Sequence, residues 1–268
     1  KNNECCIYLT KREGKVMKRK SYYMTISLIS IFIIFISCKK GVPEATLYGK
    51  LSPRIYVAGQ FNPKKNNQFV CINDYKIPTN KRKHYLRREA GVAIKKMYKA
   101  FKKDHPDVPF YVVSSTRNFF DQKWIWENKW KNVKKHSKIK NPLKRAKAIL
   151  TYSSMPGTSR HHWGSDFDLN KLYNSYFDKG NGKILFNWLK KNAKRFGFGQ
   201  PYTAGRSAGY NEERWHWSYL PLARYFLKDW NKFYKESKYF TQKGLFKGSH
   251  NAGHLAKIYV NAIDRSCK

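Results

Sequence analysis

The order of helical and strand patterns along the chain constrains its fold more than any other feature. Apolar residues recur at helical spacing in four segments and form short strand-like runs in two others. In chain order these are a helix at 84–109, a strand at 110–118, helices at 121–135 and 183–199, a strand at 213–221 and a helix at 223–240. Because the spacing is irregular and no glycine-rich phosphate loop is present, the pattern predicts an α+β domain rather than a doubly wound parallel sheet.

Two groups of large apolar residues are predicted to pack in the core. The first helix carries an apolar stripe and should end near residues 104–106. Its stripe consists of Leu86, Ala90, Ala93, Met97 and Phe101. The second helix carries a tryptophan cluster that is interpreted as packing rather than ligand stacking, formed by Trp124, Trp126 and Trp130. Gly197 is expected to close the third helix.

The chain carries a large positive charge. Its 268 residues include 55 Lys and Arg against 17 Asp and Glu, a net charge of +38 at pH 7. The excess is spread along the whole length, so it favours anionic partners in general or reflects a lysine-rich solvated surface. A hydrophobic fraction of 41% is enough for a sizeable core and excludes a disordered tail. No nucleic-acid recognition motif accompanies the charge, and we expect no nucleic-acid partner.

The N-terminal region has the pattern of an export signal. Three cations at 18–20 precede an apolar run at 24–37, whose length suits a signal-peptide core and is short for a membrane-spanning helix. Cys38 follows a small residue, as in a bacterial lipobox, so we expect residues up to 38 to be a lipoprotein signal with lipid attached to Cys38. The alternative is a signal anchor with an incidental cysteine. Residues 1–16 lie ahead of Met17 and are expected to be a mis-set start.

The remaining chain is predicted to have three parts: a tether at 39–52, a catalytic domain at 53–230 and a helical C-terminal extension at 231–268 packed on it. Export would place Cys71 and Cys267 in an oxidising compartment, where they could form one disulfide. The sequence does not decide whether they pair. We expect a monomer, bound to an envelope membrane through its lipid.

Metal-ligating residue types gather in two short segments. His161 and Asp168 are seven residues apart, with Gly164 allowing the backbone to bend between them. Downstream, His216 follows Glu213 by three residues. Catalytic zinc sites use three protein ligands of these types and leave one position for water, and a carboxylate beside that water can act as its base.

Taken together, these segments resemble a known family. S-R-H-H-W-G-S-D-F-D at 159–168 and E-R-W-H at 213–216 resemble the S-x-H-x-x-G-x-A-x-D and E-x-W-H signatures of VanY-type D-alanyl-D-alanine carboxypeptidases, in the lysostaphin, D-Ala-D-Ala peptidase and hedgehog group. The resemblance includes a strand-end segment with Ser114, Arg117 and Gln122, and covers roughly residues 85–220. It implies a hedgehog/DD-peptidase-like fold, a small antiparallel sheet flanked by helices.

The resemblance also implies roles for individual residues. His161, Asp168 and His216 would hold one zinc ion per chain, and Glu213 would be the general base and acid. Arg117 would stabilise the oxyanion and hold substrate. Two further residues are candidate substrate contacts, Ser159 and Gln122.

Several neighbouring residues compete for these roles. Asp166 stands where the family has a small residue and competes with Asp168, but the seven-residue spacing from His161 favours Asp168. His162 is interpreted as a rim or hydrogen-bonding residue and left out of the metal set. The other histidines have no partner at ligand spacing: His84, His105, His136, His250 and His254.

Family and compartment together imply a substrate. An exported metallopeptidase of this kind meets peptidoglycan stem peptides, and removal of a terminal D-alanine is the first expectation. The alternatives are an endopeptidase of the same family and a non-catalytic envelope-binding module.

Overall fold

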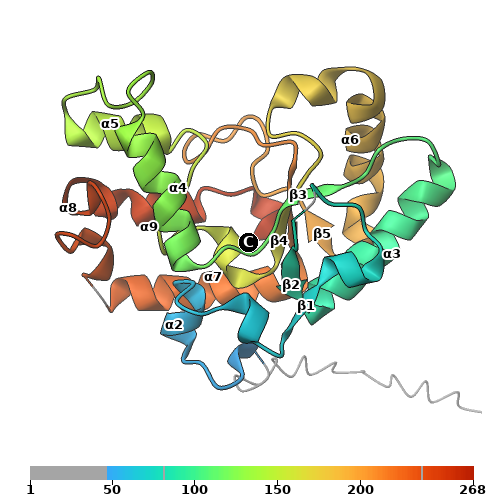
Figure 1. Ribbon diagram of the computed structural model, residues 1–268, viewed down its shortest axis with the longest axis horizontal. Helices are drawn as coiled ribbons and strands as arrows, with labels where there is room; N and C mark the ends of the chain where they lie inside the picture. Colours follow the sequence, from blue (N-terminus) through green and yellow to red (C-terminus); the bar gives the residue numbers. More distant parts are fainter. Residues whose placement is uncertain (1–46, 81, 237) are drawn as a thin grey trace, which may run out of the picture. The chain divides into compact units, whose positions relative to one another are not determined.

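A four-stranded antiparallel sheet in the computed structural model brings together strands that are far apart in the sequence (Figure 1). The structure describes residues 47–80, 82–236 and 238–268. In spatial order the strands are β3 (Val112–Ser114), β4 (Asp166–Leu169), β6 (His216–Tyr219) and β5 (Phe198–Gly199). Asp168 pairs with Ser114 on one side and with His216 on the other. The pairing therefore sets residues from three distant segments side by side.

The helices surround this sheet and confirm the α+β class. Their bounds are α2 Pro53–Val57, α3 Arg88–Asp104, α4 Phe119–Lys131, α5 Pro142–Ile149, α6 Gly180–Asn192, α7 Leu220–Lys235, α8 Ser249–Ala252 and α9 Ala256–Asn261. One core packs α3 and α6 against one face of the sheet. A second core joins α2, α4 and α5 to α7 and the C-terminal helices.

The start of the first predicted helix is a strand instead. Tyr85–Arg87 form β2, which pairs antiparallel with β1 (Phe69–Cys71), and α3 begins only at Arg88. Leu86 is fully buried, as predicted, but from this strand. The remaining stripe residues of α3 lie in or against the core, and the helix ends at Asp104 within the predicted stop.

The other predicted helices are present with shifted ends. α4 starts at Phe119 because Asn118 and Asp121 form a capping box there. The third helix ends through a short 3-10 turn at Gly197, whose φ of 83° lies in the left-handed region that glycine tolerates best. Within the tryptophan cluster Trp126 is fully buried, whereas Trp124 is 69% exposed, so the packing interpretation is wrong for Trp124.

The predicted segment boundaries fall inside packed structure. Leu47 and Tyr48 of the expected tether are buried in the second core, and α7 runs through residue 230. Cys71 and Cys267 are both free. Residues 1–38, including Cys38, lie outside the described ranges. Across those ranges, no helix has the length and apolar character that crossing a membrane requires.

Candidate active site

The alternation of side chains along β4 and β6 builds the candidate site. In a strand, residues two apart point to the same face, so Asp166 and Asp168 face one side while Phe167 packs into the core on the other. On β6, His216 and Ser218 share the aspartate face, opposite Trp217. The register then sets Asp168 beside His216 and Asp166 beside Ser218.

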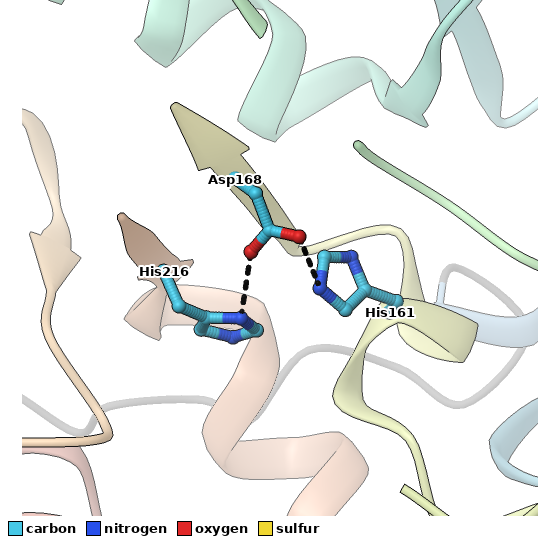
Figure 2. Close-up of side chains that lie close together, drawn as sticks. All are labelled: His161, Asp168 and His216. Atoms are coloured by element: carbon cyan, nitrogen blue, oxygen red, sulfur yellow. Dashed lines mark ion pairs between the residues drawn. The ribbon is translucent and has the colours of Figure 1, made fainter. Parts of the chain in front are cut away.

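Three predicted ligands converge at one end of this strand pair (Figure 2). Asp168 Oδ2 lies 3.3 Å from His161 Nε2, and Asp168 Oδ1 lies 3.0 Å from His216 Nδ1. His161 reaches the cluster from a 3-10 turn at Arg160–Trp163, before the bend at Gly164. All three residues are buried, and one ligand atom of each lies within 4.8 Å of the others.

Hydrogen bonds on the far side of each imidazole orient the ring so that its other nitrogen faces the cluster. His161 Nδ1 lies 2.8 Å from the carbonyl of Ser115, which can only accept, so Nδ1 carries the hydrogen and Nε2 is left as an acceptor. His216 Nε2 lies 3.0 Å from Asp166 Oδ1, which leaves Nδ1 of His216 facing Asp168. Metal-binding histidines are oriented by such carbonyl and carboxylate partners.

The donor set fits a zinc ion. Asp168 Oδ1 is buried without a hydrogen-bond partner among the described residues, although two ring nitrogens surround its carboxylate. Burial and Arg117 lower the pKa of His161, so its ring is neutral. A cation coordinated by two imidazoles and one carboxylate would satisfy these groups, and three ligands leave a zinc coordination position open.

Glu213 lies next to this cluster, in the loop before β6. Its Oε2 is 3.7 Å from His216 Nδ1, and the side chain is buried. Burial, with a contribution from Asp168, raises the pKa of Glu213 to about 8, against the opposing charges of His216 and Arg117. Its neighbour Glu212 is instead paired with Arg214 at 3.1 Å. Glu213 is therefore the carboxylate placed to exchange a proton at the site.

Arg117 contributes the positive charge of the site from the loop after β3. Its Nη1 lies 4.0 Å from Asp168 Oδ2 and also donates to Ser114 Oγ. Its Nε donates to Gln122 Oε1 at 3.0 Å, and Gln122 Nε2 donates to the carbonyl of Ser154. Gln122 lines the same cavity, but both ends of its amide are used, so here it positions Arg117.

Asp166 occupies a different environment from Asp168. Its Oδ1 accepts from Arg160 Nε at 2.9 Å and its Oδ2 from Ser165 and Ser218 hydroxyls. Burial alone would raise the pKa of Asp166, but Arg160 and these hydrogen bonds hold it at about 2. Asp166 is thus a permanent anion that binds the outer nitrogen of His216.

His162 and Ser159 point away from the cluster. The buried His162 ring donates from Nδ1 to the carbonyl of Arg117 at 2.7 Å and accepts from the Gly157 N–H at 3.0 Å. Ser159 Oγ accepts from the N–H of His161 and is 1% exposed. In this structure the Ser159 hydroxyl caps the 3-10 turn that carries His161. Its contact with substrate stays a prediction.

The site opens into a cavity of about 320 Å³ with an aromatic wall. Several lining residues were not predicted from the sequence: Ile125, Lys129, Tyr152, Leu172, Tyr202, Tyr210 and Trp215. Tyr202 packs against His216 with ring centroids 4.7 Å apart. The strand alternation of D-F-D and H-W-S could have indicated Asp166 and Ser218 as partners, whereas nothing in the sequence marked Arg160.

Comparisons with known proteins agree with this geometry. A family model described as D-alanyl-D-alanine carboxypeptidase, VanY, matches residues 83–222. The protein YodJ of Bacillus subtilis (strain 168) is 30% identical over 149 residues, which cover 52% of this chain and 47% of YodJ. The chain thus spans about half the length of this curated relative.

Solved structures with similarity to this chain include two peptidases. The LdcB LD-carboxypeptidase matches with a TM-score of 0.47 and 21% identity over 67% of this chain and 81% of that one. The D,D-pentapeptidase VanY of a VanB-type vancomycin resistance cassette, in complex with Zn(II), matches with a TM-score of 0.43 and 23% identity over 59% and 86%.

Proposed function

We propose that this chain, which belongs to the VanY family of D-alanyl-D-alanine carboxypeptidases, removes the terminal D-alanine from peptidoglycan stem peptides in a zinc-dependent hydrolysis. The observation that carries the proposal is the buried cluster of His161, Asp168 and His216 with Glu213 beside it. A structural zinc site would have four protein ligands and no need of a neighbouring base, whereas this one has three.

The metal would be held by His161 Nε2, His216 Nδ1 and the Asp168 carboxylate. When bound, zinc supplies a Lewis acid that polarises the peptide carbonyl and lowers the pKa of a water to about 7. The outward hydrogen bonds of both histidines, to Ser115 and Asp166, fix the ring orientation that this ligation needs.

Glu213 would carry the proton through the reaction. It takes a proton from the attacking water as the new C–O bond forms, and returns it to the amine nitrogen as the C–N bond breaks. The products are a shortened stem peptide and free D-alanine, and Glu213 ends as it began. Burial raises the pKa of the Glu213 carboxyl above its ordinary value, and a general base works best when its pKa lies near the operating pH.

Arg117 would stabilise the negative charge on the carbonyl oxygen. Its half-buried guanidinium offers donors that are held in place, and such interactions strengthen where water is excluded. Gln122 and Ser114 hold its position before substrate arrives, so little reorganisation is required.

The compartment is part of the same proposal. The signal pattern and Cys38 support an exported, monomeric lipoprotein that would meet stem peptides in the bacterial envelope.

The test is to incubate purified protein with defined stem peptides, with and without a chelator, and to identify products by mass. We expect release of one D-alanine, loss of activity with the chelator and recovery with zinc. Cleavage within the stem peptide would instead indicate an endopeptidase. A protein that binds zinc but cleaves no stem peptide would indicate a non-catalytic module.

A further inference from the structure

The α4–α5 region carries a concentrated positive charge that the proposed hydrolysis does not use. We define the basic hairpin as residues 131–147, the end of α4, the connecting loop and most of α5 (Figure 1). Seven of its lysines are exposed: Lys131, Lys134, Lys135, Lys138, Lys140, Lys144 and Lys147. No Asp or Glu occurs in the sequence between Glu127 and Asp166. Within the described ranges, none of these lysines forms an ion pair with a carboxylate, so their charge faces solvent.

The basic hairpin is held in one conformation. Arg145 donates to the carbonyls of Ile139 and Ser137 at 2.8 and 2.9 Å, and its guanidinium lies 5.0 Å from the centroid of the Trp130 ring. Asn141 caps α5 by accepting from the Lys144 N–H. The lysines are therefore displayed on an ordered platform, which reduces the entropy lost when a partner binds.

Large apolar side chains are exposed on the same region. Phe120 is 72%, Trp124 69% and Val133 72% exposed. With 3.6 residues per turn, Phe120, Trp124 and Lys131 fall within about 40° of one another around α4. Gln122 and Lys129 lie about opposite and line the catalytic cavity. One face of α4 thus serves the active site, and the other presents two aromatic rings on the side of Lys131.

We propose that the outer face of α4 and the basic hairpin together dock on the surface of an anionic membrane. Each lysine next to such a surface strengthens binding about fivefold, through the negative potential of the headgroups. A soluble polyanion would need only the lysines for binding and would leave the exposed apolar side chains without a role. Exposed Phe120, Trp124 and Val133 add apolar area whose burial at the boundary of headgroups and acyl chains is favourable. This docking would leave the opposite face of α4, with the cavity, free for substrate.

The experiment measures sedimentation of the full chain with vesicles of phosphatidylglycerol and phosphatidylcholine, and with vesicles of phosphatidylcholine alone. The ratio of the two partition coefficients cancels any binding by residues 1–46 that does not depend on lipid charge. For the wild type we expect a ratio well above one that falls as salt is raised. A ratio near one would overturn the proposal.

Two variants and a matched control locate the contact. K134Q/K135Q/K138Q should lower the ratio about 100-fold, and F120S/W124S should lower binding to anionic vesicles at least about tenfold. K190Q/K191Q/K194Q removes the same charge from exposed positions at the end of α6 and just after it, and should change the ratio less than about threefold. Equal losses in the two lysine triples would show that net charge alone is responsible.

A third arm separates the membrane from other polyanions. F120S/W124S should bind inorganic polyphosphate as tightly as the wild type does, because the role proposed for the two rings is contact with acyl chains. If polyphosphate binds through the basic hairpin and vesicles do not, the surface is a polymer site and the membrane proposal fails. Unchanged thermal unfolding of each variant verifies that the fold is intact.

Discussion

Two aspartates of β4, Asp166 and Asp168, lie in opposite settings. Asp166 accepts hydrogen bonds from Arg160, His216, Ser165 and Ser218. Asp168, two residues along on the same face, has a buried Oδ1 with no hydrogen-bond partner among the described residues and two imidazoles around it. Asp166 is neutralised by the guanidinium of Arg160, whereas the neighbours of Asp168 are two imidazoles that can share a metal cation with it.

The difference shows how a buried anion becomes a structural group or a ligand. Burying a charge is costly unless it is paired and hydrogen-bonded. At Asp166 the Arg160 guanidinium meets this cost within the chain. At Asp168 the nearest arginine atom, Arg117 Nη1, is 4.0 Å away, and the neutral His161 ring has a lone pair to offer. Four predictions test this contrast, beginning with the largest effect.

Asp168→Asn should abolish zinc binding and activity together. The amide is nearly isosteric but neutral, so it removes the one anionic ligand while keeping the shape of the site. Zinc stoichiometry by atomic absorption and stem-peptide cleavage measure the outcome. A variant that keeps one zinc per chain would show that Asp168 is not a ligand, and Asp166 would have to be reconsidered.

Glu213→Gln should bind zinc normally and lower kcat by about 10²–10⁴-fold, the usual contribution of a general base. The amide keeps the size of the side chain but cannot accept the proton of the water. Glu212→Gln is the matched control, because that carboxylate is paired with Arg214. Equal losses in the two variants would contradict the assignment of Glu213.

Asp166→Asn should retain zinc but bind it about 10–100-fold more weakly, as expected when the carboxylate that orients a ligand histidine is lost. It also leaves Arg160 without its anionic partner, which destabilises the fold by about 3–5 kcal/mol. Zinc titration and urea unfolding measure the two effects separately. Adding Arg160→Met should recover much of the stability but not the zinc affinity.

His162→Ala should leave zinc stoichiometry unchanged and instead alter the pH dependence of folding. Burial lowers the pKa of His162 to about 3, while an unfolded histidine has a pKa near 6.5. Below about pH 6.5 the His162 side chain binds a proton in the unfolded chain but not in the folded chain. The free energy of unfolding therefore decreases as pH falls from 6.5 toward 3.

The size of that effect follows from the difference between the pKa values of His162 in the folded and unfolded chain. Between pH 7 and pH 5 the metal-free wild type should lose about 2 kcal/mol more of its unfolding free energy than the variant. Urea unfolding at the two pH values measures it. A variant with the same pH dependence as the wild type would show that another group is responsible.

Local sequence determined the chemistry of the site but not its full surroundings. The motifs that contain His161, Asp168, His216 and Glu213 predicted, through their resemblance to a known family, residues that the fold brings together. The seven-residue spacing of the family signature favoured Asp168 over Asp166, and His162 was left out of the metal set.

Tertiary structure decided the rest, because the partners come from segments whose separation in sequence carries no signal. The segment at 85–87 has helical apolar spacing, yet pairing with β1 makes it a strand. Arg160 neutralises Asp166, and the Ser115 carbonyl fixes the tautomer of His161, through contacts that exist only once β3, β4 and β6 are aligned. The sequence determined which residues can bind a metal, and the sheet register decided which carboxylate is free to do so.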